Sequence, residues 1–221
     1  MKIDNVELEW LGHSGFLIKN SKVIYIDPYN IKDDSEKADL IFITHSHYDH
    51  CSFADINKII KDDTKIIMTA DCQSKINKFK IPIKMEIVEP GKELNISNIR
   101  ISVVPAYNLD KPFHNKNELW VGYLIKYENV LIYHAGDTDA IPEMKKLTGY
   151  NHPDKTFVAL LPVSGRFTMS SEEAVEAAKI IKPTIAIPMH YGSVMGELED
   201  AEDFKEMCEE EKIKCEILEK K

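Results

Sequence analysis

The sequence predicts an α/β fold made of two similar halves, and three observations support this prediction. Short apolar runs of strand length fill the first quarter of the chain, strand and helix patterns alternate after it, and a second series of strands is followed by the same alternation. With 221 residues, 43% of them hydrophobic, the chain is long enough to bury a substantial core. We therefore expect a single domain over residues 1–221.

In the first half, alternating apolar and polar residues and β-branched runs are typical of strands, and apolar residues at wider spacing are typical of helices. The expected strands are 6–11, 15–18, 23–26, 40–44 and 65–69, and the expected helices are 52–61 and 71–79.

The second half begins with a predicted meander of hairpins over residues 86–133, because β-rich runs nearly meet at Ser97-Asn98 and at Glu128-Asn129. Ser170 followed three residues later by Glu173 fits a capping box, which marks the start of a helix. The other expected elements are helices near 141–147 and over 170–181, strands at 157–162 and 184–188, an irregular loop at 148–156, and a closing helix and strand within 197–221.

Composition excludes several classes of protein. The net charge of -9 argues against a broad nucleic-acid-binding surface, and with 29% charged residues the chain has no apolar stretch of membrane-spanning length. The segment Met1 to Trp10 lacks the layout of a secretory signal, and the four cysteines contain no C-x-x-C pair that would indicate a disulfide framework or a thiolate metal site. We expect a soluble cytoplasmic protein without nucleic-acid or membrane partners, whose oligomeric state the sequence leaves open.

Three imidazoles and a carboxylate follow directly after an apolar strand, in Thr44-His45-Ser46-His47-Tyr48-Asp49-His50. Residues two apart in an extended chain face the same way, so His45 and His47 can hold one ion while the next turn directs Asp49 and His50 to another. Imidazole nitrogens and carboxylate oxygens are ligands of catalytic zinc, and the lack of sulfur argues against a closed structural site. The alternative is a solvated histidine-rich turn.

Two later segments offer further ligands, each after a strand of its own. Asp137 in Gly136-Asp137-Thr138 could bridge two ions, and His190, just before Tyr191-Gly192, could complete the second ion's ligands. Alone, the first would be an ordinary turn residue and the second a packed or surface histidine. Together with the earlier motif they predict a binuclear site.

The sequence resembles the metallo-β-lactamase superfamily, and within it the branch of small UlaG-like metal-dependent hydrolases. The resemblance rests on Trp10-Leu11-Gly12-His13-Ser14-Gly15-Phe16, Ile26-Asp27-Pro28, the segment from His45 to His50, Tyr133-His134-Ala135-Gly136-Asp137-Thr138, Leu161-Pro162-Val163-Ser164-Gly165 with Thr168-Met169, and Ile187-Pro188-Met189-His190-Tyr191-Gly192. It implies a four-layer αββα sandwich with the metals at one edge between the two sheets.

The resemblance also implies a ligand set for two divalent metal ions, most readily Zn²⁺, with Mn²⁺ or Fe²⁺ as alternatives. His45 and His47 would bind the first ion, Asp49, His50 and His190 the second, and Asp137 would bridge them, with Asp49, His50 and Asp137 as the catalytic residues. The family usually supplies a third imidazole to the first ion from a Pro-Ala-x-His stretch, which here reads Pro105-Ala106-Tyr107-Asn108. We expect His114 to take that place from a loop, and the alternatives are Asn108 or water.

Several neighbours of these motifs have other expected roles. His13, Asp27 and His134 are suited to orienting the ligands, since metal-bound histidines commonly donate their second ring N–H to a carboxylate or carbonyl. Ordinary structural hydrogen bonds are the alternative for all three. The tyrosines Tyr48, Tyr107 and Tyr191 could touch substrate but more often pack, and we expect His152 at the surface and Cys51 in the core.

The function implied is hydrolysis of an ester, lactone or phosphodiester bond in a small-molecule substrate by water activated between two ions. Arg166 and Lys111 favour an anionic substrate. One alternative is a di-iron oxidoreductase on the same fold, which His47 argues against because a carboxylate typically replaces it there. A nuclease would be longer and more basic, and the remaining alternative is a non-catalytic metal-binding module.

Overall fold

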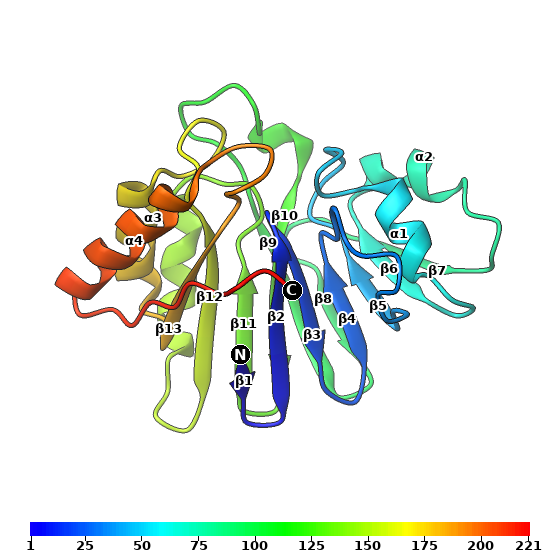
Figure 1. Cartoon of the computed structure of the whole chain (residues 1–221), viewed down its shortest axis with the longest axis horizontal. Helices are drawn as coiled ribbons and strands as arrows, with labels where there is room; N and C mark the ends of the chain where they lie inside the picture. Colours follow the sequence, from blue (N-terminus) through cyan, green and yellow to red (C-terminus); the bar gives the residue numbers. More distant parts are fainter. The chain divides into compact units, whose positions relative to one another are not determined.

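The computed structural model describes all 221 residues, and the contacts between them divide the chain into two compact units. Unit 1 comprises residues Met1–Val88 and Leu218–Lys221, and unit 2 comprises Glu89–Ile217. Each unit contains one β-sheet with its own helices (Figure 1). The single domain over residues 1–221 stays a prediction.

The sheet of unit 1 has seven strands in sequence order. The strands are β1 (Lys2–Ile3), β2 (Val6–Gly12), β3 (Gly15–Lys19), β4 (Val23–Ile26), β5 (Leu40–Phe42), β6 (Lys65–Met68) and β7 (Lys84–Ile87). Strands β1 to β4 pair antiparallel, and β4 to β7 pair parallel. The strands β2, β4 and β5 therefore run in the same direction, and their carboxyl ends meet at one edge of the sheet.

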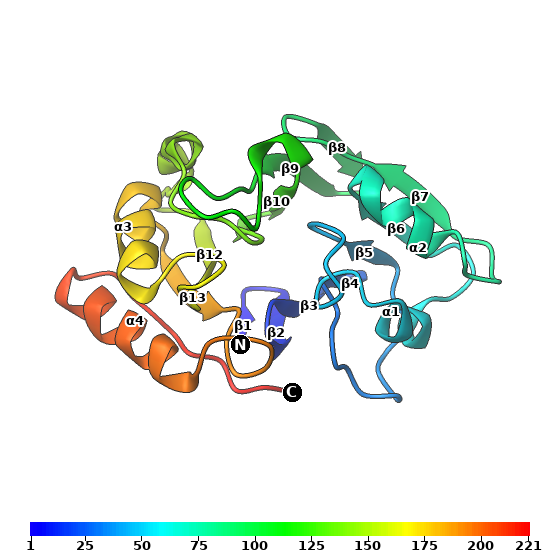
Figure 2. The same cartoon turned by 90° about the horizontal axis from the view of Figure 1, so that it is seen from above.

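The helices of unit 1 cover one face of this sheet. They are α1 (Phe53–Ile59) and α2 (Gln73–Ile76), the latter preceded by the 3₁₀ turn η1 (Ala70–Cys72) (Figure 2). The side chain of Ser52 accepts a hydrogen bond from the backbone N–H of Asp55 and so begins α1. Ile56 and Ile59 lie three residues apart on one face of the helix and are buried in the core cluster of the unit.

The sheet of unit 2 has six strands in the order β13-β12-β11-β10-β9-β8. They are β8 (Glu93–Ile96), β9 (Ile99–Pro105), β10 (Val121–Tyr127), β11 (Val130–His134), β12 (Thr156–Pro162) and β13 (Ile185–Met189). Strands β8 to β11 form an antiparallel meander, and β11 to β13 pair parallel. Strands β9, β11, β12 and β13 therefore point the same way, and the loops after them lie at one edge.

The helices of unit 2 are η3 (Pro142–Tyr150), α3 (Ser171–Ile181) and α4 (Leu198–Glu210), and a short 3₁₀ turn, η2 (Lys116–Glu118), precedes β10. Helices α3 and α4 lie side by side in both views, with α3 against β12 and α4 against β13 (Figures 1 and 2). The fully buried Phe204 of α4 contributes about 1.5–3 kcal/mol through the apolar surface that it removes from water.

Most of the predicted elements are confirmed, including both tight hairpin turns, where Ser97 and Glu128 adopt a φ of 57° and 50°. The helix expected at 71–79 is too long, since α2 ends at Ile76. Of the apolar residues in this range, Cys72 lies in η1 and Ile76 ends α2, whereas Phe79 packs against the core from the non-helical segment that follows.

Two further expectations are corrected, one in unit 2 and one at the end of the chain, and one strand is additional. The helix near 141–147 is a 3₁₀ helix that begins at Pro142 and continues to Tyr150, so the irregular loop starts later than expected. The expected C-terminal strand is replaced by two isolated bridges, Ala186 with Cys215 and Trp10 with Lys220. The first strand of the chain, β1, was not expected.

All four cysteines are buried thiols, and Cys51 lies in the core cluster of unit 1, as expected. No helix combines the length and the apolar character that crossing a membrane would require.

The capping box predicted from Ser170 and Glu173 is confirmed, because the Ser170 hydroxyl accepts from the backbone N–H of Glu173 and the Glu173 carboxylate accepts from that of Ser170. We expect Ser170→Ala to lower the free energy of unfolding by about 1 kcal/mol in urea denaturation. Ser74→Ala in α2 is the matched control, since Ser74 is exposed inside a helix, where alanine has the higher propensity. Equal unfolding midpoints for Ser170→Ala and the wild type would contradict this role of the cap.

Candidate metal centre

Every site residue predicted in unit 1 follows a strand at the shared edge of the sheet. His13 lies in the turn after β2, Asp27 comes directly after β4, and the segment from His45 to His50 follows β5. Because these strands run in the same direction, residues that are distant in the sequence are brought together.

One carboxylate organises the histidines of this segment. Asp27 is fully buried, and its Oδ1 accepts from the backbone N–H of Thr44 at 2.8 Å. Its Oδ2 accepts from the Thr44 hydroxyl at 2.6 Å and from His50 Nδ1 at 2.7 Å. The Thr44 hydroxyl in turn lies 2.9 Å from His45 Nδ1. Since that hydroxyl donates its only hydrogen to Asp27, it must accept from His45, and both imidazoles therefore carry a hydrogen on Nδ1.

The remaining predicted ligands of unit 1 lie against these two histidines. The ring centroids of His45 and His47 are 4.7 Å apart, and those of His45 and His50 are 4.1 Å apart. Asp49 Oδ2 lies 3.8 Å from His50 Nε2 and is hydrogen-bonded to His13 Nε2 at 2.9 Å. All four ligands predicted here therefore lie together in one cluster.

The predicted site residues of unit 2 meet around a second carboxylate. Asp137 follows β11, and its Oδ2 lies 3.2 Å from His114 Nε2 and 3.1 Å from His190 Nε2. All three side chains are buried. The structure thus brings His114, and not Asn108, beside Asp137, although Asn108 lies only three residues after the end of β9.

Both histidines of unit 2 are also held at Nδ1. His190 Nδ1 lies 2.9 Å from the hydroxyl of Ser164, which follows β12. His114 Nδ1 lies 3.0 Å from Asn108 Oδ1 and 3.0 Å from the carbonyl oxygen of Phe167. In four of the predicted imidazole ligands, therefore, Nδ1 contacts an oxygen of the protein, which directs Nε2 toward the opposite side of the ring.

Three residues of these clusters have a strained backbone. His13, Asp27 and His190 adopt φ values of 52°, 43° and 63°, in the left-handed region that a non-glycine residue enters at a cost of about 1–2 kcal/mol. Each follows a strand directly or by one residue. Such strain concentrates at functional sites, where the surrounding structure holds the residue in place.

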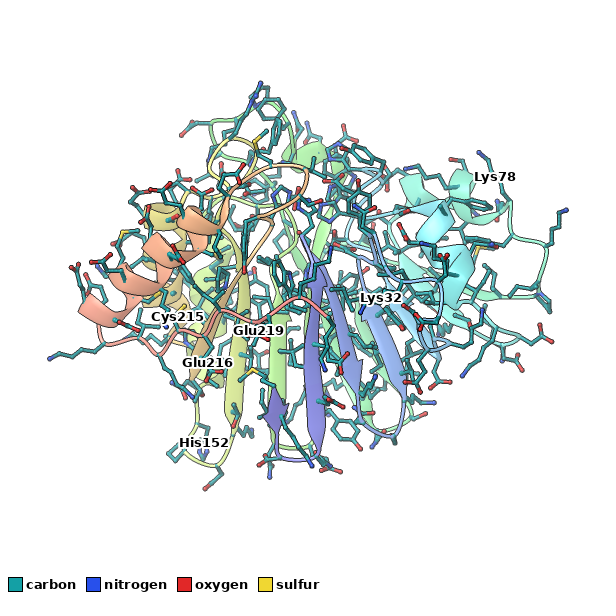
Figure 3. The ribbon with its side chains drawn as sticks, in the orientation of Figure 1. Lys32, Lys78, His152, Cys215, Glu216 and Glu219 are labelled. Atoms are coloured by element: carbon teal, nitrogen blue, oxygen red, sulfur yellow. The ribbon has the colours of Figure 1, made fainter.

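The other singled-out residues have more ordinary positions. His134 Nδ1 accepts from the backbone N–H of Gly136, which is a structural hydrogen bond within the turn before Asp137. His152 is exposed at the tip of the loop before β12, at the end of the strand away from Asp137 (Figure 3). Tyr107 and Tyr191 are buried.

The two basic residues expected to favour an anion differ in their surroundings. Lys111 Nζ pairs with the carboxylates of Asp139 and Glu173, at 2.7 Å and 3.0 Å. Partial burial lowers the pKa of Lys111, but these two carboxylates outweigh it and raise that pKa above its ordinary value. The positive charge of Lys111 is therefore already compensated within the protein, whereas Arg166 is exposed and lies over the Phe167 ring.

Four residues that support the clusters were not singled out from the sequence as site residues. They are Thr44, Gly122, Asp139 and Ser164. Thr44 and Ser164 lie within the sequence motifs described above, and this position could have indicated that they support the site. Gly122 had no such signal: a Cβ there would lie 2.7 Å from the carbonyl oxygens of His134 and Ala135, so only glycine lets β10 pass the turn that leads to Asp137.

The donor atoms in both units suit a borderline divalent cation. They are imidazole nitrogens and carboxylate oxygens without a thiolate, and the imidazoles have the supporting Nδ1 contacts that metal-binding histidines commonly make. The residues present therefore fit a catalytic zinc site or a site for a similar ion.

Comparison with known proteins agrees with this description. Residues 7–190 match the family model described as "Beta-lactamase superfamily domain". A "UPF0173 metal-dependent hydrolase" of Thermococcus kodakarensis, TK0141, is 34% identical over 91% of this chain and 92% of the relative, and one of Archaeoglobus fulgidus is 30% identical over 96% and 95%. A crystal structure of a Parabacteroides distasonis protein superposes with a TM-score of 0.83 at 29% identity, covering 97% of this chain and 94% of the other.

The chain belongs to the metallo-β-lactamase superfamily and, within it, to the UPF0173 family of metal-dependent hydrolases. The predicted α/β fold of the metallo-β-lactamase type is thereby confirmed, as is the predicted superfamily.

Proposed function

We propose that the protein hydrolyses an ester, lactone or phosphodiester bond in a small anionic metabolite, using two divalent metal ions, preferentially zinc. In this proposal His45, His47 and His114 would hold the first ion, Asp49, His50 and His190 would hold the second, and Asp137 would be shared by both. We also propose a cytoplasmic location and no nucleic-acid or membrane partner, for which the net charge of -9 is the support.

The observation that carries the proposal is the shared orientation of the imidazoles. His45, His50, His114 and His190 each have Nδ1 within 3.0 Å of a protein oxygen. An imidazole that donates through Nδ1 presents the lone pair of Nε2, which is the nitrogen needed for a divalent cation. A solvated histidine-rich turn would not require this repeated arrangement.

Two such ions, when bound, lower the pKa of a shared water toward neutrality and polarise the bond under attack. The protein's own residues orient the reaction. Asp137 presents one oxygen to His114 and His190. His13 Nε2 lies 2.9 Å from Asp49 Oδ2 and holds that carboxylate in place. Asp49 is the group that we expect to take up a proton during the reaction, and Arg166 is the exposed cation suited to a substrate anion.

The test is a hydrolysis screen with the zinc- and manganese-reconstituted protein over ester, lactone and phosphodiester libraries. We expect about two ions per chain by elemental analysis, turnover of at least one substrate class, and loss of turnover on chelation. Metal-loaded protein that hydrolyses no member of the three classes would contradict the proposal. Iron in both sites with consumption of oxygen would favour the di-iron alternative instead.

A further inference from the structure

The loop that carries His114 is closed by Asn108, which lies three residues after the end of β9. The backbone N–H of Asn108 donates to the carbonyl oxygen of His114 at 2.7 Å, and the backbone N–H of His114 donates to Asn108 Oδ1 at 2.9 Å. The loop therefore returns to its starting point, and His114 lies beside position 108, where the resembled family usually has its histidine.

The orientation of the Asn108 amide follows from its partners. Its Oδ1 faces a backbone N–H, which only donates, and its Nδ2 lies 3.0 Å from Asp139 Oδ1 and 2.9 Å from the carbonyl oxygen of Phe167, which only accept. The reversed amide would place its oxygen against two acceptors, Asp139 Oδ1 and the Phe167 carbonyl oxygen, and its NH₂ donor against the His114 N–H. Only one orientation satisfies all of these contacts.

This orientation determines which ring nitrogen of His114 carries hydrogen. Nδ1 lies 3.0 Å from Asn108 Oδ1 and from the Phe167 carbonyl oxygen, and both atoms are acceptors. Nδ1 must therefore donate, and Nε2, 3.2 Å from Asp137 Oδ2, is the nitrogen that faces the candidate metal position.

Asp139 fixes the other side of the Asn108 amide. It is buried, and its Oδ2 accepts from the backbone N–H of Leu109 at 2.8 Å while its Oδ1 accepts from Lys111 Nζ at 2.7 Å. Lys111 also donates to the carbonyl oxygen of Thr168 at 2.9 Å. The loop is thus held at its first, second and fourth residues by one charge-compensated carboxylate.

We propose that Asn108 and Asp139 are a pair of positioning residues that hold the loop-borne His114 as a ligand in place of a histidine at position 108. The proposal rests on the proposed function for the metal itself, but the contacts that it uses lie entirely among residues 107–173. Asn108 acts as the acceptor that orients the ring, and Asp139 acts as the acceptor that orients Asn108.

The test compares Asn108→Ala and Asn108→Asp with the wild type in two measurements. Chelator competition should show that one of the two ions binds about 10–100-fold more weakly, as is usual when a residue orienting a metal ligand is lost, while the other keeps its affinity. In the metal-free protein, ¹⁵N-labelled histidine should show an exchange-protected Nδ1–H signal of His114 in the wild type that is lost in Asn108→Ala. Asn98→Ala in the exposed β8–β9 turn is the matched control for both.

Asn108→Asp keeps the side-chain volume but brings the carboxylates of positions 108 and 139 together, where they repel each other. Adding Asp139→Asn restores an N–H donor between the two positions. The double variant should therefore regain part of the lost ion affinity. A folded Asn108→Ala chain that keeps both ion affinities and the protected Nδ1–H signal would overturn the positioning role of Asn108. An Asn108→Asp chain that keeps both ion affinities would overturn the role of Asp139, because only the contact with Asp139 becomes repulsive in that variant. A wild type that binds no ion would overturn the proposed function instead, and the histidine signal of the metal-free protein would still decide the role of Asn108.

Discussion

Asp137→Ala is expected to lower kcat/KM by about 1000-fold and to abolish stoichiometric binding of at least one ion. The Oδ2 atom of Asp137 lies within 3.2 Å of two imidazole Nε2 atoms, so this one oxygen faces both ligands that unit 2 offers. Removing a single preorganised electrostatic partner of a reaction centre costs about 10²–10³ in rate, and a bridging carboxylate is expected at the upper end of that range. The measurements are kcat/KM on the best substrate of the screen and elemental analysis of the variant.

Asp154→Ala is the matched control, because Asp154 is an exposed carboxylate whose side chain pairs with the exposed His152. It should leave kcat/KM within about twofold of the wild type, since surface substitutions away from such features have small effects. Equal metal content and equal metal-dependent rates in Asp137→Ala and the wild type would show that Asp137 is not a ligand.

The sequence was informative about the site wherever ligands follow strands directly. His45, Asp137 and His190 each stand one to three residues beyond an apolar run, and parallel strands bring their carboxyl ends to one edge whatever the details of packing. The position of these residues was therefore predictable from local patterns and strand direction. Their individual metal roles stay predictions.

His114 was the residue that local patterns could not place. Its position depends on Asn108, Asp139 and the carbonyl oxygen of Phe167, and the last two are separated from it by 25 and 53 residues in the sequence. The sequence of a short loop without apolar periodicity does not indicate which distant residues will accept its hydrogen bonds. Local spacing also overestimated the helix at 71–79, because Phe79 keeps the apolar spacing of a helix but lies in the non-helical segment after α2.

The second large effect is expected from Asp27→Asn, which preserves shape but changes an acceptor into a donor. Thr44 N–H requires an oxygen at the Oδ1 position, so the new Nδ2 falls at the Oδ2 position, where it faces His50 Nδ1 and the Thr44 hydroxyl. His50 must then accept at Nδ1, and the Thr44 hydroxyl becomes able to donate to His45. One substitution therefore drives both imidazoles toward the Nε2–H form, which cannot bind a cation through Nε2.

We expect Asp27→Asn to lower the binding affinity for each of the two ions by about 10–100-fold, because losing the partner of a ligating histidine typically has this effect. The rate should fall further still, since a carboxylate-to-amide change that inverts a catalytic histidine in serine proteases costs about 10⁴-fold. Chelator competition measures the affinity of each ion, and ¹⁵N spectra of the histidine rings show which ring nitrogen carries the hydrogen. Asp33→Asn, at an exposed carboxylate of the same unit, is the matched control.

Thr44→Val tests the support of His45 separately from the support of His50. It removes the hydroxyl that holds His45 but leaves the contact between Asp27 and His50, so only one ion should lose affinity, whereas Asp27→Asn should affect both. The difference arises because His45 donates to the Thr44 hydroxyl, which donates to Asp27, whereas His50 donates to Asp27 directly. If Asp27→Asn retained wild-type affinity for both ions and unchanged ring spectra, the carboxylate would be structural, and the orientation of the imidazoles would have to come from their packing alone.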